Sequence, residues 1–103
     1  MKRNTFGWTI WQARRKMRLT QQKVCQLLQQ QYSIEIDRYL LSKIENDAVD
    51  IKLPEYDFIV QALTELLKLD IEQLEDIRQQ TEVREFDPNE PSLVTYAKHI
   101  KHF

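Results

Sequence analysis

The residues best suited to chemistry in this 103-residue chain are its basic side chains, which are distributed unevenly. Residues 35–103 contain eight basic and all sixteen acidic residues, although the whole chain has a formal charge of only −1. Residues 1–34 contain no acidic residue and seven basic ones: Lys2, Arg3, Arg14, Arg15, Lys16, Arg18 and Lys23. This asymmetry indicates an anionic partner for the first third of the chain, most often a nucleic acid. A solvated face with an uneven mixture of charges is the alternative interpretation.

Groups for catalysis or metal binding are scarce. His99 and His102 are the only histidines, and without a nearby acid or thiol they predict solvated side chains rather than a metal site. Cys25, the only cysteine, shares an apolar helical face with Val24 and Leu28, so we expect a buried thiol and no nucleophile. A single glycine argues against the phosphate-cradling loops of nucleotide-using enzymes. We therefore expect no enzymatic activity, no metal and no cofactor.

The elements that position these side chains are expected to be helices, because apolar residues recur at helical spacing along most of the chain. No apolar run exceeds three residues, so we expect no membrane span. Thr20, Asp37 and Asp70 are expected N-caps, since their side-chain oxygens can accept hydrogen bonds from the first turn of a helix. The expected helices begin near residues 5, 21, 38, 54 and 71, and the one from residue 38 ends near residue 46. Residues 33–36 alternate and predict an extended connection.

Two helices joined by a turn, the second carrying basic and amide side chains, form a pattern typical of a helix-turn-helix. The residues that carry a more specific resemblance are Arg14, Thr20-Gln21, Val24-Cys25, Leu28, Leu41-Ser42-Lys43-Ile44-Glu45-Asn46, Leu63, Leu66-Leu67, Leu69, Asp70 and Leu74. Over about residues 6–77, the chain thereby resembles the lambda-repressor/Cro-like (XRE-type) family of helix-turn-helix transcriptional regulators. The resemblance implies an all-α, five-helix DNA-binding domain over residues 1–80, followed by an amphipathic extension over residues 81–103.

The resemblance also implies a role for each matched position. Arg14 and Glu45 correspond to the family's structural ion pair, which ties the first helix to the end of the third. Gln21, at the start of the second helix, corresponds to a phosphate contact.

The third helix would be the recognition helix. Arg38 or Lys43 would donate to guanine, and Tyr39 would touch a thymine methyl group or a phosphate. Ser42 and Asn46 would lie near the DNA backbone. A packing role for Tyr39 and a solvated helix face for the two basic residues are the alternatives.

The chain departs from the family pattern around this helix. Residues 29–37 form a connection about six residues longer than the compact family turn. Asp47 stands where the family usually has glycine, and Glu35 and Asp37 bring negative charge close to the expected phosphate.

The extension provides a second candidate interface. Residues 83–86 are strand-like, residues 87–91 form a linker, and Ser92 can cap a last helix. The apolar side of that helix comprises Leu93, Tyr96, Ile100 and Phe103. We expect it to join two copies into a homodimer, although folding back onto its own domain stays open.

The sequence thus predicts a regulator, a repressor by preference, that binds double-stranded DNA specifically by inserting residues 38–46 into the major groove. We expect it in the cytoplasm, associated with the nucleoid. The alternative is an antitoxin or adaptor-type interaction module with the same fold, which would hold a protein partner through residues 82–103.

Overall fold

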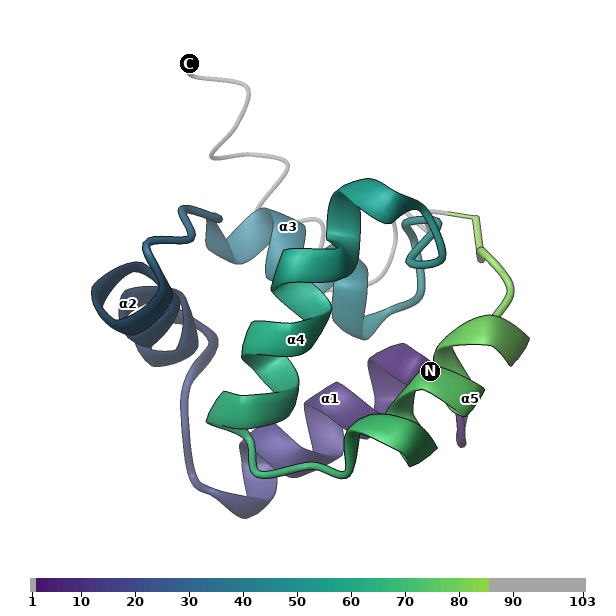
Figure 1. Cartoon of the computed structure of the whole chain (residues 1–103), viewed down its shortest axis with the longest axis horizontal. Helices are drawn as coiled ribbons and strands as arrows, with labels where there is room; N and C mark the ends of the chain where they lie inside the picture. Colours follow the sequence, from purple (N-terminus) through teal and green to yellow (C-terminus); the bar gives the residue numbers. More distant parts are fainter. Residues whose placement is uncertain (1, 86–103) are drawn as a thin grey trace.

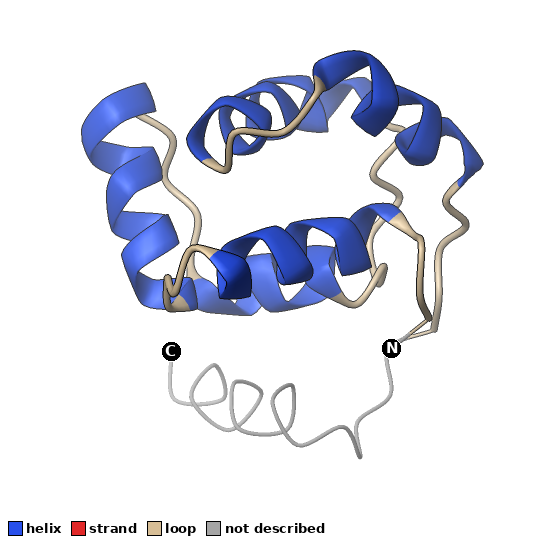
Figure 2. Ribbon diagram, turned by 90° about the horizontal axis from the view of Figure 1, so that it is seen from below, coloured by secondary structure: helices blue, strands red, loops and turns tan. Residues whose placement is uncertain are grey.

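The computed structural model describes residues 2–85 and is all-helical over that range, which confirms the expected all-α class (Figure 1). Its elements are α1 (Phe6–Lys16), α2 (Gln21–Tyr32), α3 (Arg38–Glu45), a 3-10 turn η1 (Pro54–Tyr56), α4 (Asp57–Leu66) and α5 (Ile71–Gln80). Figure 2 shows that helices and loops make up the whole of this range, with no strand. No helix of residues 2–85 is both long enough and apolar enough to cross a membrane.

Side-chain caps fix the starts of four helices. Thr20 accepts a hydrogen bond from the Lys23 N–H at 3.0 Å, and Asp70 accepts one from the Gln73 N–H at 3.1 Å. Asp37 caps α3 and Thr5 caps α1 in the same way. Each such cap stabilises its helix by about 1 kcal/mol, because it satisfies an N–H that has no partner within the helix. The three N-caps predicted from the sequence are confirmed.

The core lies among all five helices, and α3 is seated on α1 and α2. In turn, α4 packs against α2 and α5, and in Figure 1 it runs through the centre of the molecule with α2 at the left and α5 at the right. The fully buried large apolar side chains are Phe6, Ile10, Val24, Leu28, Leu41, Ile44, Val60, Leu63 and Leu74. An eight-residue helix is too short to be stable in isolation, so α3 depends on this packing.

The structure differs from the sequence interpretation in several places. Ile71, the first residue of α5, is 46% exposed, whereas the charged Arg78 on the same helix is 5% exposed. The segment that begins at Pro54 starts as a 3-10 turn before α4. Residues 83–85, part of a segment expected to be strand-like, form no strand, whereas residues 33–37 form a connection without helix, as the sequence predicted. The linker at 87–91 and the helix expected after Ser92 lie outside the described residues.

Candidate functional site

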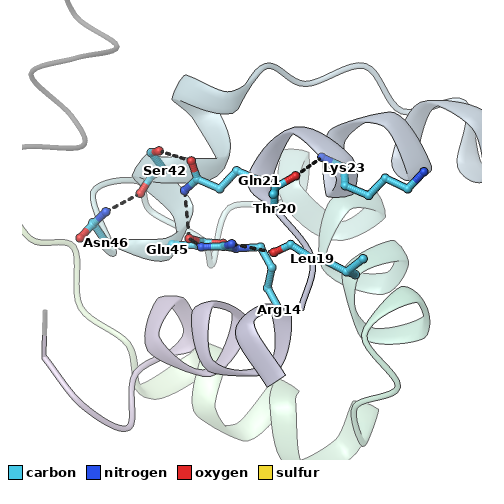
Figure 3. Close-up of polar contacts among 8 residues, drawn as sticks. All are labelled: Arg14, Leu19, Thr20, Gln21, Lys23, Ser42, Glu45 and Asn46. Atoms are coloured by element: carbon cyan, nitrogen blue, oxygen red, sulfur yellow. Dashed lines mark hydrogen bonds and ion pairs between the residues drawn. The ribbon is translucent and has the colours of Figure 1, made fainter. Parts of the chain in front are cut away.

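An ion pair joins the end of α1 to the end of α3. Arg14 Nε donates to Glu45 Oε2 at 2.6 Å, and Arg14 Nη2 donates to Glu45 Oε1 at 3.0 Å (Figure 3). The third guanidinium nitrogen, Nη1, donates to the Leu19 carbonyl oxygen at 2.8 Å. The Glu45 side chain is 1% exposed and that of Arg14 is 12% exposed. The structure therefore brings together the two residues expected to pair, in a two-pronged geometry that fixes their orientation.

The start of α2 is connected to the same carboxylate. Gln21 Nε2 donates to Glu45 Oε1 at 3.0 Å, and the Ser42 hydroxyl donates to Gln21 Oε1 at 3.1 Å (Figure 3). The Glu45 carboxylate of α3 thus bonds to side chains of both α1 and α2 and connects the three helices. The Gln21 amide carries two N–H donors, and the contact with Glu45 uses one of them.

Ser42 and Asn46 face the interior rather than the surface. Ser42 is fully buried, and Asn46 is 7% exposed and donates from Nδ2 to the Ser42 carbonyl oxygen at 2.8 Å. Their burial does not fit the direct contact with a DNA backbone that the resemblance implied. The reason is that Ser42 lies on the side of α3 that meets Gln21, so both residues help to position the helix instead.

The outer face of α3 carries the remaining candidate residues. Arg38 is exposed, whereas Tyr39 and Lys43 are partly buried. Lys43 Nζ lies 5.5 Å from the centroid of the Tyr39 ring, a cation–π geometry between residues one helical turn apart. Tyr39 is therefore packed against Lys43 and partly exposed, and its contact with DNA stays a prediction.

Asp47 connects the end of α3 to the start of α1. Its carboxylate accepts hydrogen bonds from the Gly7 N–H at 2.8 Å and from the Thr5 hydroxyl, and the residue is 3% exposed. Burial raises the pKa of this carboxyl group, and the contacts with Thr5 and Gly7 oppose the rise. Asp47 adopts a left-handed backbone, φ 58°, which aspartate tolerates where glycine is usual. From the sequence, Asn46-Asp47 is expected to end the third helix for this reason, and the left-handed backbone of Asp47 agrees with that expectation.

The only glycine stands where α1 meets α3. A Cβ atom at Gly7 would lie 2.5 Å from the Glu45 carbonyl oxygen and 2.6 Å from Asp47 Oδ1. No real side chain fits there without movement of the backbone. The sequence signal for this contact, a glycine among the first residues of an apolar helix, was too general to identify it.

Most basic side chains of residues 1–34 are exposed at the surface. Of these seven basic residues, only Arg14 is held in the buried ion pair; the exposed ones are Lys2, Arg3, Arg15, Lys16, Arg18 and Lys23. Both acidic residues within 38–47, Glu45 and Asp47, are buried. The exposed acidic residues closest to α3 in the sequence are Glu35 and Asp37, and Asp37 caps the helix.

The structure offers little for covalent or metal chemistry between residues 2 and 85. Burial raises the pKa of the Cys25 thiol to about 11, so the reactive thiolate is disfavoured at neutral pH. Cys25 is partly exposed rather than fully buried as expected. No group of three or more histidine, cysteine or acidic side chains in this range is arranged to hold a metal ion. His99 and His102 lie outside the described residues.

No family model, curated protein or solved structure matches this chain. The resemblance to the lambda-repressor/Cro-like family therefore stays an interpretation of the sequence motifs. The candidate site rests on the geometry of its own residues.

Proposed function

We propose that the chain is a sequence-specific DNA-binding transcriptional regulator whose helix α3 enters the major groove of duplex DNA. The observation that carries this proposal is the sorting of charge around α3. The carboxylates of Glu45 and Asp47 are turned inward, while Arg38 and Lys43 stay on the outer side of the helix. DNA carries a high density of negative charge, so a surface of this kind attracts it and buried carboxylates do not oppose the approach.

The network behind α3 supports the proposal, because base readout requires a helix held in a fixed orientation. The Glu45 carboxylate contacts both Arg14 and Gln21, which come from the two helices on which α3 lies. Recognition of bases would then need no rearrangement of the protein. The main conformational cost of binding would then be the entropy that the long basic side chains at the surface lose when they are immobilised.

Each surface residue has a role within this proposal. Arg38 and Lys43 would donate hydrogen bonds to the O6 and N7 atoms of guanine, and Tyr39 would contact a thymine methyl group or a phosphate. Lys23 in the first turn of α2, together with the second N–H of the Gln21 amide, would contact the phosphate backbone. Two copies bound as a homodimer would place their α3 helices in successive major grooves, and occupation of a promoter by such a dimer would repress it.

Selection of bound sequences from random duplex DNA, run beside a measurement of mass in solution, tests the proposal. We expect an enriched inverted repeat whose half-sites are centred about 10 base pairs apart, and a mass of two chains. A library that stays random after several rounds would contradict sequence-specific binding.

A protein-interaction module is the second candidate function, and the apolar surface at the start of α4 favours it. Phe58 is 79% exposed beside a cavity of about 470 Å³ that Tyr32 and Ile34 also line, and Leu53 nearby in sequence is 41% exposed. Large apolar side chains gathered at a surface are typical of partner contacts. This function predicts that Phe58→Ser abolishes partner binding, whereas Arg38→Ala and Lys43→Ala do not affect it.

A further inference from the structure

A groove between α4 and α5 is unused by the proposed DNA contact. It encloses about 580 Å³, and its lining includes the apolar side chains Leu69 and Ile71 and the carboxylates of Asp57, Glu65 and Glu75. Ile71, 46% exposed, is one of the few large apolar residues of the described chain that solvent reaches so freely. The groove therefore combines an apolar surface with acidic edges.

The helices around this groove carry a strong negative charge. Residues 54–80 contain seven acidic and two basic residues, the latter being Lys68 and Arg78. Arg78 is 5% exposed and neutralises part of the negative charge of the groove, since it donates to Asp57 at 2.8 Å and to Glu75 at 3.0 Å. Glu65, which also lines the groove, is exposed and leaves its edge acidic.

One segment of the same chain has the complementary composition. Residues 92–103 contain no acidic residue, and they carry Lys98 and Lys101. Their apolar residues follow a helical spacing of three, four and three: Leu93, Tyr96, Ile100 and Phe103.

We propose that the groove between α4 and α5 binds residues 92–103 of this chain, with the apolar residues on Leu69 and Ile71 and the lysines beside Glu65 and Glu75. The contact would cover the exposed apolar surface and pair opposite charges at the rim. It is independent of the proposed DNA binding, because α3 is seated on α1 and α2 instead.

Zero-length carbodiimide cross-linking of the full chain, followed by mass spectrometry, tests the contact, because this reagent joins only lysines and carboxylates that touch. We expect Lys98 or Lys101 to be linked to Glu65 or Glu75, the two glutamates that line the groove. Links from these lysines to Glu35 or Asp37, or no links from them at all, would overturn the proposal. An equal mixture of ¹⁵N-labelled and unlabelled chains shows whether the segment comes from the same copy or from a second one, and either result supports the assignment of the groove.

Charge reversal in the full chain provides the second measurement. Glu65→Lys should raise the rate of amide hydrogen exchange in residues 92–103 by about fivefold, the effect of losing a favourable rim pair. The double variant Glu65→Lys with Lys101→Glu should restore slow exchange. Glu35→Lys, a reversal at an exposed acid before α3, is the matched control and should leave the rate unchanged. Equal exchange in wild type and Glu65→Lys, or an equal effect of the control, would contradict docking in this groove.

Discussion

The Asp47 carboxylate accepts a hydrogen bond from the Gly7 N–H at 2.8 Å, so the residue that follows α3 binds the first turn of α1. Together with the Arg14–Glu45 pair at the other end of α1, this contact attaches α1 to α3 at two points. Helix α3 is short, and its orientation is set by these polar contacts as much as by the core beneath it. The stability of the fold and the geometry of the candidate interface therefore depend on the same residues.

Gly7→Ala should destabilise the protein by about 2 kcal/mol or more, because the added methyl group would lie 2.5 Å from the Glu45 carbonyl oxygen. Denaturant unfolding measures the loss. The control is Gln12→Ala, at an exposed position of the same helix, which should change stability by less than about 0.5 kcal/mol. Equal stabilities for the two variants would show that α1 and α3 are not packed as closely as described.

Asp47 should make stability depend on pH in the direction opposite to that of an ordinary paired carboxylate. Burial holds its folded-state pKa above the ordinary value of 3.8, so ionisation favours the unfolded chain. The contribution of Asp47 to stability is therefore full below pH 3.8 and is lost as the pH rises through the folded-state pKa.

The comparison variant is Asp47→Asn, which keeps the shape and tolerates the left-handed backbone. On acidification from neutral pH, wild type should gain stability relative to this variant, as measured by denaturant unfolding at a series of pH values. A difference that stays constant, or that shrinks as the pH falls, would contradict the raised pKa.

Arg14→Ala should cost about 3–5 kcal/mol of stability, because it leaves the Glu45 carboxylate buried with Gln21 as its remaining side-chain donor. The double variant Arg14→Met with Glu45→Leu should recover much of this loss, since no unpaired charge is then left in the interior. Arg15→Ala removes an exposed guanidinium that lies 5.1 Å from the Trp11 ring centroid, and it should cost no more than about 1 kcal/mol. A similar loss for Arg14→Ala and Arg15→Ala would contradict the structural role of the ion pair.

The parts of this architecture that are encoded locally could be predicted from the sequence. Thr20, Asp37 and Asp70 cap helices because a short polar side chain can accept a hydrogen bond from a backbone N–H in the first turn of the helix that follows it. The pairing of Arg14 with Glu45 was implied by the family resemblance, and both residues lie where it placed them.

What could not be predicted depends on tertiary contacts. Nothing in the local pattern shows that Arg78 is buried, because its guanidinium is satisfied by the Ile51 and Leu53 carbonyl oxygens, more than twenty residues away in sequence. The same holds for Ser42, which is polar but is bonded to Gln21 in the interior. The exposure of Ile71 at the start of α5, beside a buried Arg78 on the same helix, likewise cannot be seen in the local sequence pattern.

The proposed DNA affinity should fall steeply with salt, because binding by the exposed cations releases ions condensed on the phosphates. With about five phosphate contacts, the slope of log K against log salt concentration would be about −4.5. Lys23→Ala should make this slope shallower by about one while lowering affinity for all sequences alike. A flat titration, or a slope that Lys23→Ala leaves unchanged, would contradict the role of the cationic surface.

The most direct test of the account is the affinity of three variants for a duplex enriched by selection. Arg38→Ala and Lys43→Ala should each weaken specific binding by about 1–3 kcal/mol, and each should cost no more than about 1 kcal/mol of stability, because neither side chain is fully buried. Lys68→Asn removes one exposed positive charge from the turn before α5, at a left-handed position that asparagine tolerates, and it should bind like wild type. Full affinity in both α3 variants would contradict the insertion of α3 into the groove.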